Sequence, residues 1–316
     1  MKGKRYTVVL ANLGAPANLD EVRPFLKNIF NDPDIFNFPF GNIGREIFSS
    51  LIAALRAPIS RKYYVAIGGG SPLLKNTVEQ ADKLKQSLSS EGDFDVKVAQ
   101  RYWYPYLSDV ATYLRLEVVE NIILLPLYPH YSTTTTLSIE NEWQRVAPDL
   151  VNTTVIKRFY DNEYYIKACT EQIKQKLKKF DVDPHILFSA HSIPIKRVVD
   201  GDPYEKEINH NVELIMQNLG KDYSYSLSYQ SKVGPIKWLS PSMEEEIDRL
   251  VAEGICHLLV FPISFVSEHL ETLYELDIQK KDYALKNGIE IYERANTVQT
   301  QPEFIKCLKT LVLEGI

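Results

Sequence analysis

The stretch from Cys256 to Gln279, CHLLVFPISFVSEHLETLYELDIQ, joins a buried strand to a helix and sets the expected fold. Residues 257–261 form a short, continuous apolar run, which is typical of a strand buried on both faces of a parallel sheet. Pro262 ends this strand because proline has no N–H to give to the ladder. Apolar residues then recur at helical spacing, and Ser267 can cap the helix that they predict. Such a helix begins at the carboxyl end of a strand, where ligands bind in α/β sheets.

Acidic and imidazole side chains line this predicted helix. Glu271, Glu275 and Gln279 are spaced i, i+4 and i+8 and so fall on one stripe, with Glu268 and His269 at its start. Carboxylates on one stripe repel each other, which is tolerated more readily where a cation or a proton visits. A solvated helix face with a capping histidine explains the same residues, and the stripe taken alone favours that explanation.

A second stretch, HILFSAHSIP at residues 185–194, shifts the balance toward a functional site. It is again a buried-type strand, and it runs into a small-residue turn that carries His191. Two strand ends therefore each deliver an imidazole or a carboxylate, and these groups can meet in one cleft.

Length and composition indicate an ordinary globular protein of about two domains, since the chain has 316 residues, of which 45% are hydrophobic and 24% charged. The net charge of −5 argues against a nucleic-acid partner, which requires a basic face. The first apolar run is too short for a signal peptide, and no run approaches the roughly 20 residues that span a bilayer. We therefore expect a cytoplasmic protein with, at most, a peripheral membrane contact.

The three cysteines, Cys169, Cys256 and Cys307, lie far apart and in no CxxC pattern. This spacing argues against a disulfide framework and against a cysteine zinc site. We expect buried free thiols.

Strands alternate with helices along the whole chain. The expected strands lie at 6–10, 95–99, 120–129, 153–159, 185–190, 223–229, 257–261 and 288–292. Each half begins with a strand that ends in a turn with proline (Pro16, Pro194) and later has a strand broken by proline (Pro126, Pro262). We therefore predict an α/β fold of two similar Rossmann-like domains, each a parallel sheet flanked by helices, which face each other over a cleft. The predicted domains are 1–158 and 159–300, and a terminal helix at 301–316 can pack back on the first.

Two further segments have open interpretations. Residues 42–56 predict a helix with one apolar face, which either covers a core or forms a hydrophobic lip for an apolar ligand or a membrane surface. Its large apolar residues are Ile43, Ile47, Phe48, Leu51, Ile52 and Leu55. The segment IGGGSP at 67–72 matches neither nucleotide-binding glycine motif, so a tight turn or an anion site with Ser71 is favoured.

Eight blocks of the chain resemble the ferrochelatase family, in the same order and at comparable spacing. They are LANLGAP, FLKNIFNDPDIF, IGGGSP, LPLYPHYSTTTT, FSAHSIP, GDPY, YQSKVGPIKWLSP and PISFVSEHLETLYELDI. The resemblance spans nearly the whole chain. It implies insertion of ferrous iron into protoporphyrin IX without ATP, the terminal step of haem synthesis, by a class II chelatase-like fold.

The resemblance also implies site residues. His191 and Glu271 form the catalytic pair and bind the metal together with Glu275, while His269 and Glu268 support them. The implied porphyrin-binding residues are Leu13, Ile35, Phe36, Arg56, Tyr64, Ser71, Arg101, Tyr102, Tyr131, Trp238 and Phe265. A neutral imidazole can take a pyrrole proton or pass iron, and nitrogen and oxygen ligands suit Fe(II) without holding it as thiolates would. Gln279 stands where many relatives have an acid, which shortens the acidic path.

No permanently bound cofactor is expected, because Fe²⁺ is a substrate and three cysteines are too few for a [2Fe–2S] cluster. Two alternatives stay open. One is a related chelatase that uses cobalt or another tetrapyrrole. The other is a carrier that binds porphyrin or haem without inserting metal, which would not need an imidazole facing an acidic stripe. Coproporphyrin also stays open as a substrate in place of protoporphyrin.

Overall fold

The computed structural model describes residues 4–36, 41–232, 234 and 236–316. The chain divides into two compact units, which are described separately below. The first is Met1–Lys157 together with Leu308–Ile316, and the second is Arg158–Cys307. The sequence prediction set the boundary between 158 and 159 and treated 301–316 as a separate terminal helix.

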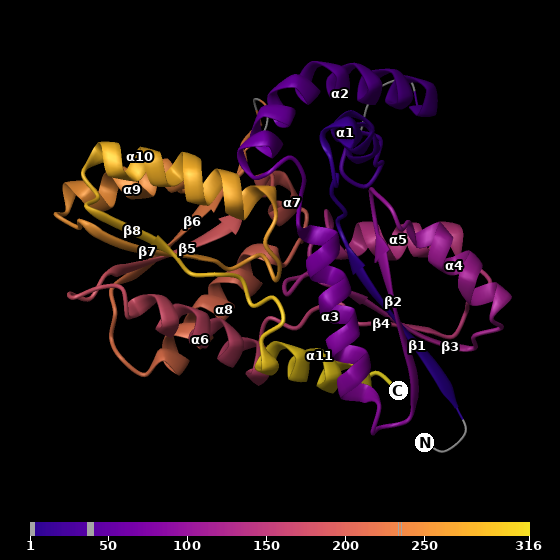
Figure 1. Cartoon of the computed structure of the whole chain (residues 1–316). Helices are drawn as coiled ribbons and strands as arrows, with labels where there is room; N and C mark the ends of the chain where they lie inside the picture. Colours follow the sequence, from indigo (N-terminus) through magenta and orange to yellow (C-terminus); the bar gives the residue numbers. More distant parts are fainter. Residues whose placement is uncertain (1–3, 37–40, 233, 235) are drawn as a thin grey trace. The chain divides into compact units, whose positions relative to one another are not determined.

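The first unit is built on a parallel sheet in the order β2-β1-β3-β4 (Figure 1). Its strands are β1 (Arg5–Asn12), β2 (Asp93–Gln100), β3 (Asn121–Pro126) and β4 (Thr153–Val155). Its helices are η1 (Leu19–Glu21), α1 (Val22–Phe30), α2 (Gly41–Ala66), α3 (Leu73–Leu88), α4 (Leu107–Leu116) and α5 (Thr136–Val146), and α11 (Pro302–Glu314) ends in this unit.

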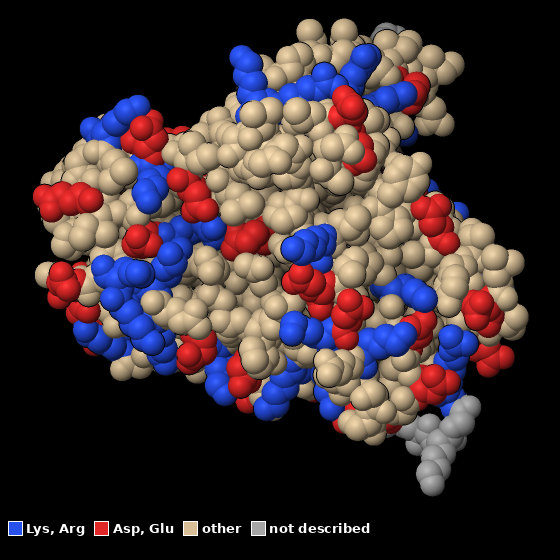
Figure 2. All heavy atoms as spheres, in the orientation of Figure 1, with Lys and Arg blue, Asp and Glu red and all other residues tan. Residues whose placement is uncertain are grey.

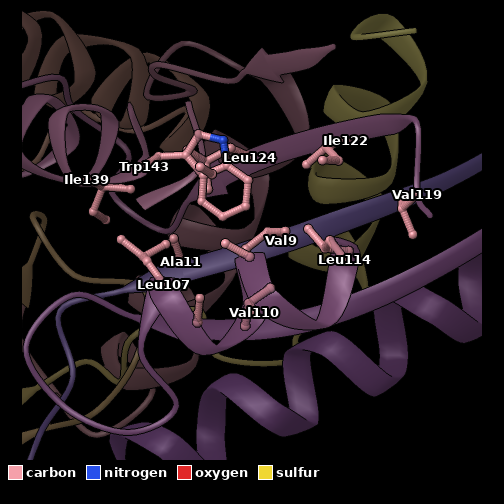
Figure 3. Packing of buried hydrophobic residues seen from close by; sticks show 13 residues of the cluster. Val9, Ala11, Leu107, Val110, Leu114, Val119, Ile122, Leu124, Ile139 and Trp143 are labelled. Carbon is pink, nitrogen blue, oxygen red and sulfur yellow. The ribbon is translucent and has the colours of Figure 1, made fainter. Parts of the chain in front are cut away.

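The core of the first unit lies between the sheet and helices α4 and α5 (Figure 3). Val9 and Ala11 of β1 pack there with Leu114 of α4 and Trp143 of α5. The alternate residues of β1, such as Leu10, are also fully buried. The strand is therefore buried on both faces, as its continuous apolar run predicts.

The second unit repeats the same strand order, β6-β5-β7-β8, and all its pairs are parallel. Its strands are β5 (His185–His191), β6 (Tyr225–Gln230), β7 (His257–Pro262) and β8 (Ile291–Arg294). Its helices are α6 (Glu163–Leu177), α7 (Ile195–Val199), α8 (Tyr204–Leu219), α9 (Met243–Ala252), η2 (Glu271–Lys280) and α10 (Lys281–Asn287). In Figure 1, α9 and α10 lie on one side of this sheet, and α6 and α8 on the other. The predicted fold class, two similar Rossmann-like units with parallel sheets flanked by helices, is confirmed.

Several local predictions are also confirmed. Pro262 is the last residue of β7, and Pro126 is the last residue of β3 in the first unit. Ser242 and Glu245 form a reciprocal capping box at the start of α9. Gly220 ends α8 in the left-handed conformation, with φ of 71°.

The helix after β7 differs from the prediction. It is a π-helix from Glu271 to Lys280, and its start, at Leu270, has no side-chain cap, so Ser267 does not cap it. A π-helix has i→i+5 hydrogen bonds and thus more residues per turn than an α-helix. Glu275 therefore falls just short of one full turn after Glu271, rather than just past it.

Helix α2 also differs, because it continues past the predicted end at Arg56, through the exposed Pro58, to Ala66. Its buried face consists mostly of small residues, such as Ser49, Ala53 and Ala57, and it packs closely against α1. Of its predicted large apolar residues, Ile43, Ile47, Leu51 and Leu55 are 54–76% exposed, while Phe48 and Ile52 are half-buried. Of the two interpretations of this helix, coverage of a core is therefore wrong for those four exposed residues.

Candidate functional site

The predicted central residues meet at the carboxyl ends of two neighbouring strands in the second unit. His191 is the last residue of β5, and Glu271 begins η2, shortly after the end of β7. Strands β5 and β7 are paired in the sheet, so these two ends lie side by side although His191 and Glu271 are 80 residues apart in sequence. Ligands bind at this edge of parallel α/β sheets.

His191 and Glu271 form a direct pair. The Nδ1 of His191 lies 2.9 Å from Oε2 of Glu271. Because a carboxylate accepts hydrogen bonds, Nδ1 carries the proton, and the opposite nitrogen Nε2 is the one that can accept a proton or bind a metal. The side chains are 37% and 25% exposed, so the pair is reachable from solvent.

Two hydroxyl side chains hold the backbone of His191 through hydrogen bonds. Its N–H donates to the Ser264 hydroxyl at 3.1 Å, and its carbonyl accepts from the Tyr204 hydroxyl at 2.9 Å. The two hydroxyls are 2.7 Å apart. These contacts fix the backbone that carries the imidazole, while Glu271 holds the ring itself.

The electrostatics of the pair follow from its geometry. Burial alone would lower the pKa of His191, but the adjacent Glu271 charge, with a smaller contribution from Glu275, raises that pKa above its usual value. Burial would raise the pKa of Glu271, but His191 and His269 lower it well below its usual range. At neutral pH Glu271 is therefore a carboxylate.

His269 lies on the other side of Glu271. Its Nδ1 is 3.1 Å from the carbonyl of Ser267 and must carry a proton, since a carbonyl only accepts. Its Nε2 is 3.8 Å from the same Glu271 oxygen that faces His191. The Phe265 ring packs edge-on against both imidazoles, with ring centroids 4.4 Å from His269 and 6.3 Å from His191. The structure thus brings four predicted site residues together.

Glu275 lies next along η2, and its carboxylate is bound by groups near the end of β6. It accepts from the Ser231 backbone N–H at 3.0 Å and from the Ser231 hydroxyl, while Lys280 is 3.9 Å away. Burial and the Glu271 charge raise the pKa of Glu275. Glu275 is therefore a more readily protonated carboxyl next to an ionised one, while Gln279 is exposed at the outer end of the stripe.

Glu268 belongs to a different cluster. Its Oε1 accepts from the Thr297 N–H at 2.8 Å and lies 3.1 Å from the guanidinium of Arg294. Arg294 also binds both carboxylate oxygens of Asp277 on η2, at 2.6 and 2.7 Å. Glu268 therefore helps to anchor the π-helix through Arg294.

Predicted porphyrin-binding residues of the first unit follow the carboxyl ends of its strands. Leu13 comes after β1, Arg101 and Tyr102 come after β2, and Tyr131 comes in the loop after β3. Leu13 and Tyr131 are half-buried. Hence the edge of this sheet that corresponds to the His191 edge also carries residues that the family resemblance singles out.

Arg101 and Tyr102 do not present free polar groups, however. Tyr102 is 2% exposed, and its hydroxyl donates to the buried carboxylate of Asp32. The guanidinium of Arg101 lies 3.1 Å from the same carboxylate and 3.5 Å from Glu142. Both residues are therefore committed to Asp32 within the protein. Burial would raise the pKa of Asp32, but Arg101 and two hydroxyl donors lower it.

The other predicted porphyrin-binding residues lie in varied environments. Half-buried Ile35 and Phe36 donate their backbone N–H groups to the backbone carbonyl of Asp32, while Arg56 is exposed on α2. The last three are buried Tyr64 on α2, half-buried Ser71 before α3, and half-buried Trp238, which bridges to Pro194 in the second unit.

Ser71 does not offer its backbone to an anion. Its N–H donates to the Pro16 carbonyl at 2.9 Å, and its hydroxyl accepts from the Leu73 N–H at 3.3 Å. A Cβ at Gly70 would lie 2.0 Å from the Ala17 carbonyl oxygen, so glycine is required there for close backbone approach. The tight-turn interpretation of IGGGSP fits these contacts.

Sequence reasoning did not assign a role to four residues that hold predicted site residues in place: Asp32 in the first unit, which binds Arg101 and Tyr102, and Tyr204, Ser231 and Ser264 in the second unit, which bind His191 or Glu275. Each lies inside one of the quoted sequence blocks, which is the signal that could have found them. Ser231 stands out in the structure because its φ is 66°, a left-handed conformation that is uncommon outside glycine.

Comparisons with solved structures support the fold. SirB from Bacillus subtilis, solved with Fe³⁺, aligns with a TM-score of 0.61 at 10% identity and covers 98% of this chain and 95% of its own. CbiX, described as the terminal enzyme for siroheme biosynthesis in denitrifying bacteria, aligns with a TM-score of 0.55 at 11% identity, covering 99% and 100%. At these identities the likeness shows a shared fold alone.

Comparisons of sequence are far closer. The ferrochelatase of Aquifex aeolicus is 47% identical over 309 residues, which cover 96% of this chain and 97% of that protein. The ferrochelatases of a Sulfurihydrogenibium species and a Synechocystis species are 43% and 42% identical, over 100% and 99% of this chain and 100% and 83% of their own. The ferrochelatase family model matches residues 5–316. The chain therefore belongs to the ferrochelatase family.

Proposed function

We propose that this protein inserts ferrous iron into protoporphyrin IX to form protohaem, the terminal step of haem synthesis. The observation that carries the proposal is the His191–Glu271 pair, with a nitrogen-to-oxygen distance of 2.9 Å, at the carboxyl edge of the second sheet. Family membership supplies the reaction, and the pair supplies the groups that the reaction requires.

Metal insertion must remove two N–H protons from the porphyrin. In our proposal Nε2 of His191 accepts a pyrrole proton, and the Glu271 carboxylate stabilises the imidazolium that forms. The carboxyl of Glu275, whose pKa is raised, can then receive or relay a proton away from the macrocycle. His269 and Phe265 keep Glu271 and His191 in place through the contacts described above.

Iron enters this scheme as a substrate, and no resident cofactor or ATP takes part. Imidazole nitrogen and carboxylate oxygen bind Fe(II) without the strong retention of thiolate ligands. For the porphyrin, exposed Arg56 offers a cation to a propionate, and half-buried Leu13 and Phe265 offer apolar contacts. Because Arg101 is already paired with Asp32, we assign it the role of holding Asp32 and the adjacent loop.

The competing function is a carrier that binds porphyrin without metal insertion. Absorbance spectra of the purified protein with protoporphyrin IX and Fe(II) under anaerobic conditions decide between them. Conversion of the porphyrin spectrum to that of haem supports the proposal. A shifted spectrum that stays that of a metal-free porphyrin would favour the carrier, and parallel runs with Co(II) and coproporphyrin test the related chelatases.

We further propose that this protein works in the cytoplasm and contacts membranes peripherally through α2. In the described part of the chain, no helix is both long enough and apolar enough to span a bilayer. Five large apolar residues at four-residue intervals along α2 are 54–76% exposed: Ile43, Ile47, Leu51, Leu55 and Ile59. Figure 2 shows blue Lys and Arg side chains beside tan surface over this helix, at the top of the view. An apolar stripe bordered by cations suits an anionic lipid surface.

Vesicle flotation tests this contact. The double variant Ile47→Glu/Leu51→Glu should lose binding to anionic vesicles, because both side chains lie on the exposed stripe. Leu285→Glu changes an apolar residue of α10 that is 44% exposed and should bind as the wild type does. Equal binding by all three proteins would contradict a role for α2.

A further inference from the structure

Three side chains with metal-binding atoms meet at the amino ends of strands β7 and β8, whereas His191 lies at the carboxyl end of β5. They are Cys256, His257 and Glu290, and their ligand atoms all lie within 4.8 Å of one another. Nε2 of His257 is 3.9 Å from Oε2 of Glu290. Within the described part of the chain, these three residues form the group of His, Cys, Asp or Glu side chains whose ligand atoms lie close enough together to hold a metal ion.

The sheet fixes the backbone of all three residues. His257 begins β7 and pairs in register with Ile291, the first residue of β8. The backbone N–H of Glu290 donates to the Cys256 carbonyl at 2.8 Å, and the N–H of Ile291 donates to the same oxygen at 3.2 Å. The three donors are therefore attached to two neighbouring strand starts and do not depend on a loop for their proximity.

Cys256 also differs from the other two cysteines. All three thiols are free, but Cys169 and Cys307 are fully buried, whereas Cys256 is partly exposed. The expectation of buried free thiols is thus confirmed for two cysteines and wrong for Cys256. The absence of a CxxC pattern could not reveal this arrangement, because one of the other two ligands is the adjacent His257 and the other is Glu290, which directly precedes β8.

We propose that Cys256, His257 and Glu290 form a second metal site, which binds Zn²⁺ and leaves one coordination position to water. One thiolate sulfur, one imidazole nitrogen and one carboxylate oxygen are ligands typical of zinc, and a thiolate favours zinc over harder cations such as Mg²⁺. Binding requires the thiolate, so the Cys256 proton leaves to solvent as the zinc–sulfur bond forms.

The geometry needs only a small closure. Zinc binds sulfur at about 2.3 Å and nitrogen or oxygen at about 2.0–2.2 Å, so donors at tetrahedral positions lie about 3.3–3.8 Å apart. Nε2 of His257 and Oε2 of Glu290 are 3.9 Å apart and no two of the ligand atoms are more than 4.8 Å apart, so each pair must close by at most about 1.3 Å. The Glu290 side chain is 73% exposed, so it is free to rotate toward the other two without disturbing the core.

This site is separate from the place of metal insertion. It lies at the amino end of β7, while the insertion residues lie beyond the carboxyl end of that strand. The two ends of β7, His257 and Pro262, are five residues apart. At about 3.3 Å per residue, the strand alone separates them by about 17 Å. Zinc held there links β7 to β8 and is not positioned to enter a porphyrin at His191.

Cobalt absorption tests the proposal on the full chain. Co²⁺ bound by a thiolate gives a near-ultraviolet charge-transfer band, and none of His191, Glu271 and Glu275 is a thiol. We expect the intact protein to show this band at one Co²⁺ per chain, and Zn²⁺ to displace it. Cys256→Ser should abolish the band, while the control Cys169→Ala, in a buried cysteine of α6, should keep it.

Variants of the other two ligands test how much each contributes to Co²⁺ affinity. His257→Ala should weaken Co²⁺ binding by more than the roughly 10–100-fold that loss of an outer-shell partner costs, because it removes a direct ligand. Glu290→Gln should also weaken binding, while Glu213→Gln, at an exposed acid of α8, should not. Iron insertion should be unchanged in all of them. Absence of the band at saturating Co²⁺, its persistence in Cys256→Ser, or unaltered affinity in His257→Ala would overturn the proposal.

Discussion

Replacing Glu271 by glutamine should cost far more metal insertion than the same change at Glu275. Glutamine keeps the shape of the side chain and removes its charge. At Glu271 that charge lies 2.9 Å from Nδ1 of His191 and stabilises the imidazolium that forms when the ring takes a proton. At Glu275 the carboxylate is bound by the Ser231 N–H at 3.0 Å, and Lys280 lies 3.9 Å away.

The expected magnitudes follow from these contacts. Loss of general acid–base assistance typically costs about 10²–10⁴-fold, so Glu271→Gln should lower kcat by that factor. At 1.36 kcal/mol per factor of ten, this is about 2.7–5.4 kcal/mol of transition-state stabilisation. Glu275→Gln leaves the His191–Glu271 pair intact and should cost about 10-fold or less, or about 1.4 kcal/mol.

Steady-state kinetics at varied Fe(II), under anaerobic conditions, measure both variants, and quenching of porphyrin fluorescence measures porphyrin affinity. Porphyrin affinity should stay near that of the wild type in both, because neither carboxylate is proposed to hold the macrocycle. The double variant should lose little more than Glu271→Gln alone, since the two residues act in one proton path. Equal losses at the two positions, or no loss at either, would refute the reasoning and make the acidic stripe a solvated helix face.

Four further outcomes are expected. His191→Ala should lose metal insertion and keep porphyrin binding, whereas a purely structural histidine would lose stability and keep its specific activity. Glu271 raises the pKa of His191, and the rate of metal insertion should rise as pH increases through that pKa, because the imidazole then becomes neutral. Glu271→Gln removes the charge that raises this pKa, so the acid limb of the pH–rate profile should move to lower pH. An acid limb that stays in place or moves to higher pH would contradict the pairing of His191 with Glu271. Arg294→Met leaves two carboxylates without their cation, one of them buried, and should lower the free energy of unfolding in urea by about 3–5 kcal/mol. The control Arg115→Met breaks an ion pair with Asp149 in which both side chains are exposed, and it should change that free energy little; similar losses in both would show that the buried cluster adds nothing. Gln279→Glu should alter the KM for iron modestly and leave porphyrin affinity unchanged in the fluorescence titration, and a large change in porphyrin affinity would place this residue at the macrocycle.

Much of the fold could be predicted because its signals are local. The apolar runs at 185–190 and 257–261 predict strands buried on both faces, and both are found in the centre of the second sheet. The prolines that end β3 and β7, one in each half of the chain, are part of the internal repeat that predicts two similar units. Such patterns depend on a few neighbouring residues, so the sequence alone carries them.

The helix after β7 shows where local patterns are insufficient. Apolar spacing predicts an α-helix, yet the chain forms a π-helix from Glu271 to Lys280. Asp277 of this helix binds Arg294 on β8, and the carbonyl of Leu276 accepts from the buried Tyr292 hydroxyl. Contacts with a strand that comes later in the chain accompany this backbone geometry, and no local pattern within the helix itself encodes them.

The sequence by itself determined the strand–helix alternation, the buried strands, and the blocks that carry His191 and Glu271. Only the tertiary structure decided which side chains pair. It engaged Arg101 and Tyr102 with Asp32, tied Glu268 to Arg294, and brought Cys256 to Glu290. The physical reason is that parallel pairing aligns strand ends that are far apart in the chain, so a partner is chosen by sheet register and burial rather than by sequence distance.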